Sequence, residues 1–235
     1  MFSLNQKTCD YMNIVLTHEC NRRCQFCVDQ YRGRKEYISK SKVEQALGFA
    51  KWEGIKDILL TGGEPTLHPD VVEIAQMVYK HGFRVIMTTN YGRPEVVKQL
   101  DGIVDCFNVS VYDQPALPQQ SDFVSDLTLH TLIHKLRLGT KQELDEFIDR
   151  RGGMGHLKFS TLSPCNEWCV RNQHVEYLDD LDARWVVLFN EMLGQVYRGA
   201  TIKRYDKVFR NSAKQSLKCH VDGAITYSWT RSDID

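Results

Sequence analysis

The chain has 235 residues, enough for one domain with a large hydrophobic core, or for one domain with a small appendage. Hydrophobic residues make up 42% and charged residues 26%, proportions that are typical of soluble globular proteins. The 30 basic and 30 acidic residues cancel, which argues against a dominant electrostatic attraction to nucleic acid or an anionic membrane and leaves a local basic patch as the alternative.

No apolar stretch reaches the ~18 residues that a membrane-spanning helix needs, so no membrane association is expected. Eight cysteines occur without a secretory signal at the start of the chain. This combination is typical of a reducing compartment and argues against a disulfide framework. The expected location is therefore the cytoplasm.

Apolar segments of strand length alternate with segments of helical periodicity, which predicts βα units and a parallel sheet. Helices are expected to begin after Pro69 and Pro94, where proline can occupy the first turn. Strands are expected at residues 13–17, 56–61, 84–89, 106–112, 127–133 and 156–162. Further helices are expected at residues 41–53, 140–150 and 177–197, the last from an apolar stripe at helical spacing. The tail from residue 201 contains scattered basic residues and one expected strand at residues 224–229.

Three cysteines lie close together after the first expected strand, with the spacing Cys20-x3-Cys24-x2-Cys27. Thiolates this close in one loop can bind a single inorganic centre, and iron–sulfur clusters are held by such thiolates, usually four of them. With three protein ligands, a cubane [4Fe–4S] cluster keeps one iron open to a substrate or cofactor. A zinc site is the alternative, but zinc prefers four ligands in paired clusters, and no second pair follows at finger spacing.

Two further motifs lie at the ends of expected strands. A Gly-Gly-Glu-Pro motif at residues 62–65 follows the second strand, and Thr-Thr-Asn at residues 88–90 closes the third. Together with the cysteine spacing, they resemble the radical S-adenosylmethionine (SAM) superfamily, CxxxCxxC type. The chain departs from the Thr-Asn-Gly of many members, because Tyr91 follows the asparagine and Gly92 comes one place later.

The resemblance implies an α/β fold, a partial (β/α)6 TIM-like barrel with a short C-terminal extension. The radical SAM core would span residues 11–200, and the extension residues 201–235. In parallel α/β folds, ligands bind beyond the C-terminal ends of the strands. Every motif described above lies at such an end, so residues that are distant in the sequence are expected to meet at one site.

The resemblance also implies the cofactors: a [4Fe–4S] cluster held by Cys20, Cys24 and Cys27, and SAM bound at the open iron. The residues expected to bind SAM are Phe26, Gly62, Gly63, Glu64, Asn90, Ser110 and Ser163. The two glycines would let backbone approach the methionine end, and Glu64 would accept a hydrogen bond from the SAM ammonium group. Phe26 and Ser163 would lie near the adenine. Asn90 and Ser110 would contact the ribose or the carboxylate.

Blander interpretations remain open for several of these residues. The glycine motif by itself could be an ordinary turn. Asn90 could cap the helix that follows it, and Ser110 could simply be packed within its strand. No catalytic residue is assigned beyond the cluster site.

Cys165 and Cys169 follow the sixth expected strand, and Cys219-His220 lies in the tail. With a fourth ligand they could hold an auxiliary iron–sulfur cluster, as C-terminal extensions of some relatives do. The tail lacks the dense cysteine spacing of those extensions, so we expect ordinary thiols, or thiols that act on substrate. Cys106 precedes an apolar strand and is expected to be a small core residue.

The segment 114–141 is expected to line the substrate side. Its basic side chains could engage an anionic substrate, with a solvated face as the alternative; they are His130, His134, Lys135, Arg137 and Lys141.

The function expected is that of a radical SAM enzyme. It would cleave SAM reductively on a [4Fe–4S] cluster, and the 5′-deoxyadenosyl radical would abstract hydrogen from a small-molecule or peptide substrate. Its electron donor would be a reductase or a flavodoxin-type protein. The alternative is an iron–sulfur binding or electron-transfer protein without SAM chemistry, which leaves the Gly-Gly-Glu-Pro motif unexplained. The sequence determines neither the substrate nor the outcome of the reaction.

Overall fold

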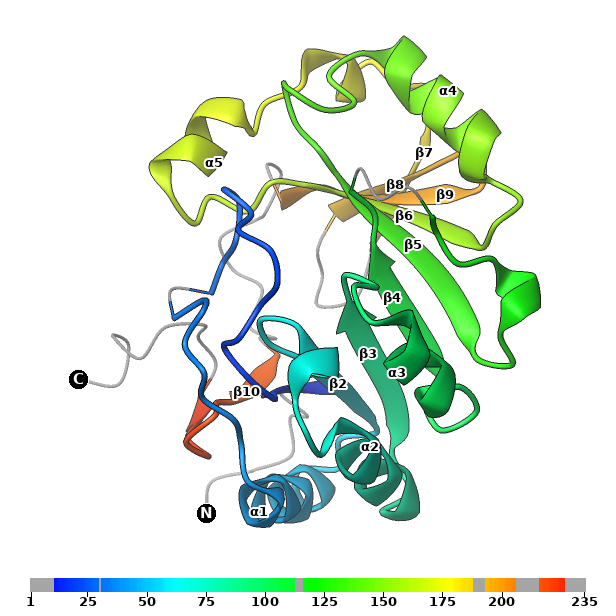
Figure 1. Ribbon diagram of the computed structural model, residues 1–235. Helices are drawn as coiled ribbons and strands as arrows, with labels where there is room; N and C mark the ends of the chain where they lie inside the picture. Colours follow the sequence, from blue (N-terminus) through cyan, green and yellow to red (C-terminus); the bar gives the residue numbers. More distant parts are fainter. Residues whose placement is uncertain (1–10, 30, 113–115, 188–192, 206–215, 227–235) are drawn as a thin grey trace, which may run out of the picture. The chain divides into compact units, whose positions relative to one another are not determined.

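A computed structural model describes residues 11–29, 31–112, 116–187, 193–205 and 216–226 (Figure 1). The chain forms two compact units. The first contains residues 1–22, 29–107 and 213–235, and the second contains residues 23–28 and 108–212. Among the described residues, no helix is long and apolar enough to cross a membrane.

The first unit consists of successive βα segments. Its strands are β1 (Tyr11–Val15), β2 (Asp57–Thr61), β3 (Arg84–Thr89) and the start of β4 (Cys106–Ser110), with β10 (Leu217–Cys219) and β11 (Ile225–Thr226) from the tail. Its helices are α1 (Lys40–Trp52), η1 (Pro65–Leu67), α2 (Val71–Lys80) and α3 (Pro94–Leu100). The strand order is β11-β10-β1-β2-β3-β4. Strand β2 pairs in parallel with both β1 and β3, as the alternation of strands and helices predicts.

The elements of this unit form for local reasons. The Ser39 hydroxyl caps α1 by accepting from the Lys42 amide, and Val43, Ala46, Leu47 and Ala50 bury one face of that helix. Strand β2 alternates between buried and partly exposed residues, and Ile58 and Leu60 are fully buried. The expected helices and strands between residues 13 and 112 are confirmed, with shifts of a few residues at their ends.

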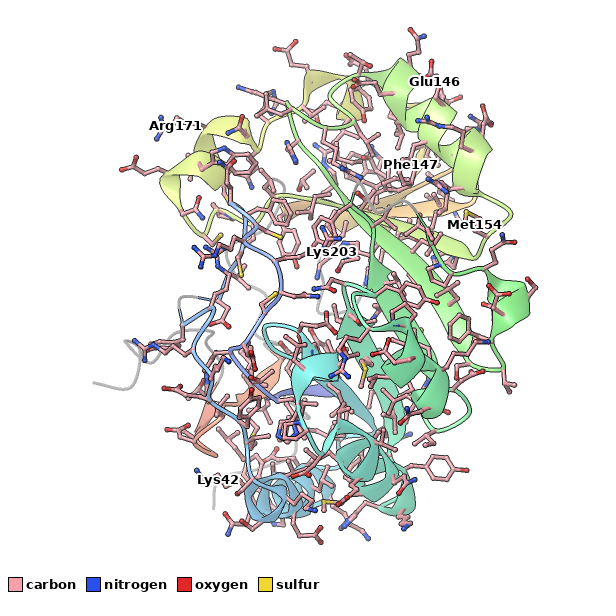
Figure 2. All side chains as sticks on the ribbon, in the orientation of Figure 1. Lys42, Glu146, Phe147, Met154, Arg171 and Lys203 are labelled. Carbon is pink, nitrogen blue, oxygen red and sulfur yellow. The ribbon has the colours of Figure 1, made fainter. Side chains whose placement is uncertain are left out.

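The second unit continues the pattern with β5 (Asp126–Ile133), α4 (Lys141–Arg151) and β6 (His156–Thr161), after η2 (Gln120–Asp122). It also contains α5 (Glu167–Asn172), η3 (Glu176–Leu178), β7 (Arg184–Val187), β8 (Leu193–Tyr197) and β9 (Ala200–Lys203). The strand order is β4-β5-β6-β9-β8-β7. Strands β5, β6 and β9 run parallel. A capping box of Thr140 and Glu143 begins α4, and Figure 2 shows Phe147 on the side of α4 opposite Glu146, where its ring meets Phe159 of β6.

The prediction of a helix at residues 177–197 is wrong. Residues 184–187 and 193–197 instead form the antiparallel strands β7 and β8, and β8 pairs antiparallel with β9. Gly194 lies in this segment, where a helix would be disfavoured, and Gln195 and Arg204 bond to each other in the interior. Leu188 and Met192 of the supposed apolar stripe lie outside the described residues.

The tail contributes to the sheet of the first unit. Strand β10 pairs in parallel with β1, and the Asn13 side chain donates to the Leu217 carbonyl at 3.1 Å. A tight turn at Asp222 and Gly223 leads into β11, which begins the expected strand; residues 227–229 lie outside the described part. The domain boundary at residue 200 stays a prediction.

Candidate cofactor site

The Gly-Gly-Glu segment packs directly against the chain that leads into Cys20. The Gly63 amide donates to the Thr17 carbonyl at 2.7 Å, and the Glu64 amide donates to the Glu19 carbonyl at 2.8 Å. A Cβ at Gly62 would lie 2.3 Å from the Thr17 carbonyl oxygen, and one at Gly63 would lie 2.2 Å from the Glu19 carbonyl oxygen. The glycines therefore allow close backbone contact with the cysteine loop, a use that the sequence did not reveal.

We expect Gly63→Ala to destabilise the protein by about 3 kcal/mol, because the new methyl group meets backbone that cannot rotate away. Gly48→Ala is the matched control. Gly48 lies inside α1 with no atom near its missing Cβ, so this change should stabilise by about 0.5–1 kcal/mol. Urea unfolding measures both, and equal stability of the two variants would contradict the packing role of Gly63.

The Glu64 carboxylate is buried at the centre of this segment. One oxygen accepts from the Thr66 amide (3.1 Å), the Thr66 hydroxyl (2.7 Å) and the Thr89 hydroxyl (2.7 Å). The other oxygen accepts from the Asn90 amide at 2.7 Å. A carboxylate offers about four acceptor positions. The SAM ammonium contact expected for Glu64 would therefore be a fifth.

Asn90 connects this network to the cysteine loop. Its side-chain amide donates to Asn21 Oδ1 at 2.6 Å and lies 4.0 Å from the Cys20 sulfur, and its Oδ1 accepts from the Gly92 amide. Tyr91 takes a left-handed conformation with φ 58°, where relatives with Thr-Asn-Gly carry glycine. Gly92 is packed against Asn21, so the displaced glycine still serves the loop.

The cysteine loop is anchored at both sides within the first unit. The buried His18 ring bonds to Asp29 at 2.9 Å, and its carbonyl accepts from the Gly33 amide. Cys20 belongs to the first unit, whereas Cys24 and Cys27 belong to the second, and all three are partly exposed.

Among the described residues, no three His, Cys, Asp or Glu side chains form a site for a single metal ion. A cubane cluster differs from a single ion, because its thiolates attach to separate iron corners. Three thiols in one anchored loop match the donor chemistry of such a cluster.

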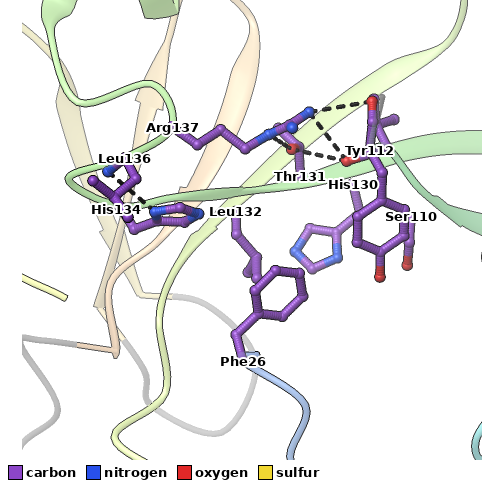
Figure 3. Close-up of a pocket in the computed structure, with 10 residues that line it drawn as sticks. Phe26, Ser110, Tyr112, His130, Thr131, Leu132, His134, Leu136 and Arg137 are labelled. Atoms are coloured by element: carbon purple, nitrogen blue, oxygen red, sulfur yellow. Dashed lines mark hydrogen bonds between the residues drawn. The ribbon is translucent and has the colours of Figure 1, made fainter. Parts of the chain in front are cut away.

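A cavity of about 250 Å³ lies in the second unit, at the ends of β4 and β5 (Figure 3). Phe26 and Ser110, both predicted to bind SAM, line it together. The Phe26 ring is nearly parallel to the Tyr112 ring, with centroids 6.0 Å apart. The centroid of the Trp168 ring lies 6.3 Å from that of Phe26. The sequence assigned no role to Trp168, whose contact with Phe26 joins residues far apart in the chain.

Two histidines of the cavity are held neutral. Burial, with the charges of Lys158 and Lys203, lowers the pKa of His130 to about 3, and its Nε2 lies 2.9 Å from the Ser160 hydroxyl. Burial and Arg137 also lower the pKa of His134, whose Nδ1 accepts from the Leu136 amide. At neutral pH both rings therefore offer hydrogen bonds without charge.

The other expected residues lie elsewhere. The Ser163 carbonyl accepts from the Cys165 amide, and Ser163 does not line the cavity. Arg137 lines the cavity but donates to the carbonyls of residues 111 and 112. Lys135 is exposed, and Lys141 pairs with Asp145 on α4. Of the basic residues expected on the substrate side, the structure thus brings His130, His134 and Arg137 together.

Cys165 and Cys169 form a close pair in the second unit. Their sulfurs are 3.4 Å apart, and the Cys165 sulfur lies 3.9 Å from the carbonyl oxygens of Phe26 and Cys27. Asn166 caps α5 and also donates to the Gln25 carbonyl at 3.0 Å. Cys165 is exposed, while burial raises the pKa of Cys169 to about 11. Cys165 is therefore the more accessible of the two thiols.

We expect the azo oxidant diamide to convert Cys165 and Cys169 into a disulfide. The two thiols lose two protons and two electrons, which reduce diamide to its hydrazine. Non-reducing peptide mapping should show this bond, and Cys165→Ser should prevent it. Cys219, buried in β10 of the first unit with its pKa raised to about 11, should stay reduced. A bond from Cys165 to a loop cysteine would contradict the pairing.

The sequence model of the radical SAM superfamily matches residues 14–113, which include the cysteine loop, the Gly-Gly-Glu segment and Asn90. Residues 14–113 belong to the radical SAM superfamily. The resemblance to this superfamily that the motifs indicated is thereby confirmed.

Two curated radical SAM relatives match part of the chain. A probable GTP 3′,8-cyclase of Thermococcus kodakarensis is 35% identical over 108 residues, which are 43% of this chain and 34% of the relative. An S-adenosylmethionine-dependent nucleotide dehydratase of Thermoplasmatales archaeon ISO4-H5 is 32% identical over 101 residues, which are 42% and 36% of the two chains. The match spans about a third of the length of these relatives.

Solved structures confirm the fold class. Streptococcus suis SuiB bound to S-adenosylmethionine has a TM-score of 0.60 at 13% identity, covering 94% of this chain and 60% of SuiB. SuiB bound to its precursor peptide SuiA has a TM-score of 0.58, also at 13% identity and with the same coverage of both chains. The α/β class with a partial TIM-like barrel is therefore confirmed.

Proposed function

We propose that this radical SAM protein is an enzyme that binds a [4Fe–4S] cluster through Cys20, Cys24 and Cys27. When bound, the reduced cluster supplies the electron that cleaves SAM into methionine and a 5′-deoxyadenosyl radical, which abstracts hydrogen from a substrate. The observation that carries the proposal lies in the first unit. The backbone amides of Gly63 and Glu64 donate to the backbone that leads into Cys20. The side-chain amide of Asn90 lies 4.0 Å from the Cys20 sulfur.

The protein's own residues prepare the site in three ways. The two glycines hold the cysteine loop close to the end of β2, and Glu64 orients the end of β3 through Asn90. In the second unit, Phe26 and Ser110 line a cavity with aromatic walls, which suits the adenosyl part of SAM. Neutral His130 and His134 can bond to a polar ligand without attracting a counterion.

The substrate in this proposal is a small molecule or a peptide. The matched curated relatives are named for nucleotide chemistry, and the structural neighbour was solved with a peptide. A reductase or flavodoxin-type protein would donate the electron. The cytoplasm is the proposed location, because a labile cluster and its cysteine ligands need a reducing compartment.

The test is an anaerobic incubation of the reconstituted protein with SAM and dithionite. We expect 5′-deoxyadenosine and methionine in equal amounts, measured by mass spectrometry. Cys106→Ala, which changes a cysteine outside the loop, should leave this yield unchanged. A reconstituted cluster that dithionite reduces, without any 5′-deoxyadenosine, would instead favour an electron-transfer protein.

A further inference from the structure

Four polar side chains meet on one face of strands β5, β6 and β9. His130 of β5 stands opposite Lys158 of β6, and Ser160 of β6 stands opposite Lys203 of β9. Opposite residues of neighbouring strands point to the same face with Cβ atoms about 5 Å apart. The bond of 2.9 Å between His130 and Ser160 closes the group diagonally. We call these four residues the lysine–histidine cluster.

The cluster adjoins the cavity in the second unit. His130 and Leu132 are two residues apart on β5, so their side chains point to the same face of the sheet. Both line the cavity (Figure 3). Ser160 lies at the register of Leu132, and Lys203 is the last residue of β9. Ser160 and Lys203 thus lie toward the strand ends where ligands bind in parallel α/β folds, while His130 and Lys158 lie nearer the middle of their strands.

Two positive charges are concentrated in this cluster without an evident counterion for Lys203. Lys158 and Lys203 are half-buried, and both lie close enough to His130 to disfavour its protonation. The Lys203 ammonium (Figure 2) lies 4.6 Å from the centre of the Tyr205 ring. Within the part of the chain that the structure describes, no carboxylate pairs with Lys203.

This arrangement has a cost that a bound anion would remove. Two ammonium groups on one sheet face repel each other more strongly when they are half-buried than in open water. Lys141, a lysine on α4 of the same unit, instead pairs with Asp145. The neutral His130 ring and the Ser160 hydroxyl share one hydrogen bond, which leaves this pair one further donor for an anion without adding charge.

We propose that the lysine–histidine cluster binds an anionic group of the substrate, a phosphate or a carboxylate. This inference rests on the proposed function, since it assigns the substrate of that same enzyme. Lys158 and Lys203 would supply the charge, while His130 and Ser160 would orient the group beside the cavity.

The experiment uses the full-length reconstituted protein saturated with SAM, so that sites for the SAM carboxylate are already filled. Pyrophosphate and succinate serve as probes for the two anion chemistries, and calorimetry measures their affinities. We expect saturable binding of one probe, weakened at least tenfold by Lys203→Met and by Lys158→Met. Lys203→Arg, which keeps the charge, should remain within threefold of the original protein.

Lys135→Met is the matched control, because Lys135 is an exposed lysine of the same unit that does not line the cavity. It should leave probe binding unchanged. Circular dichroism and Tm would verify that each variant is folded. If Lys158→Met is not folded, Lys158→Gln takes its place. Absence of saturable binding by both probes, or equal affinity in the control and the cluster variants, would overturn the proposal.

5′-Deoxyadenosine release, measured on the same samples, separates this inference from the proposed function. Normal release without probe binding overturns the anion site alone. Probe binding that depends on Lys158 and Lys203, without any release, supports the anion site and overturns the SAM chemistry.

Discussion

Replacing Cys20, Cys24 and Cys27 together by alanine should abolish cluster binding and, with it, all 5′-deoxyadenosine formation. The reason is that thiolates are the only strong iron ligands in this loop, and a cluster has no other attachment there. After anaerobic reconstitution, the unchanged protein should contain about four iron atoms and four sulfides per chain and absorb light at roughly 400 nm. The triple variant should lose both signals.

The control for this prediction is the double variant Cys165→Ala/Cys169→Ala. This pair lies beside the backbone of Phe26 and Cys27, but we expect it to hold no cluster in the resting protein. Its iron content should remain about four per chain. Full iron content in the triple variant would refute the loop as the cluster site. About eight iron in the unchanged protein, falling to four in the double variant, would show a second cluster.

Glu64→Gln should weaken SAM binding and also destabilise the fold. The glutamine has the shape of the glutamate but offers only one acceptor oxygen to four buried donors. If that oxygen keeps the Thr66 and Thr89 donors, the new NH₂ group faces the Asn90 amide. A buried unsatisfied donor costs about 1–3 kcal/mol, so we expect a loss of that size in unfolding free energy. Affinity for SAM should fall by about tenfold, or roughly 1.4 kcal/mol.

A double-mutant cycle shows how Glu64 acts. If it orients Asn90, the effects of Glu64→Gln and Asn90→Ala on SAM affinity should be clearly less than additive. If it contacts the SAM ammonium directly, the two effects should add. Glu73→Gln, at an exposed glutamate of α2 that pairs with Lys40, should change stability by less than about 0.5 kcal/mol. Unchanged SAM affinity in Glu64→Gln would remove this residue from the site.

The candidate site was predictable where its chemistry depends on local spacing. The cysteine loop, residues 62–64 and Asn90 each lie within a short stretch and end an apolar strand, so sequence patterns identified them. Their partners were not predictable. That the Glu64 carboxylate binds Thr89 and the Asn90 amide, and that Gly63 meets Glu19, follows from strands that pair only after folding.

The error at residues 177–197 has a physical cause. Large apolar residues at three- and four-residue intervals fit the face of a helix, but the same residues also fit a hairpin when a partner strand is present. Here β9 provides that partner through its antiparallel pairing with β8. Tertiary context therefore outweighed the local periodicity.

The sequence by itself determined the βα order, the cysteine loop and the superfamily, because these depend on periodicity and spacing along a continuous chain. Only the tertiary structure decided which distant residues meet. It paired β10 with β1, with Asn13 bonded to Leu217, and it set the register that places Lys158 beside His130 and Lys203 beside Ser160. Register depends on contacts between segments far apart in the chain, and a shift of one residue would turn each of these side chains to the opposite face.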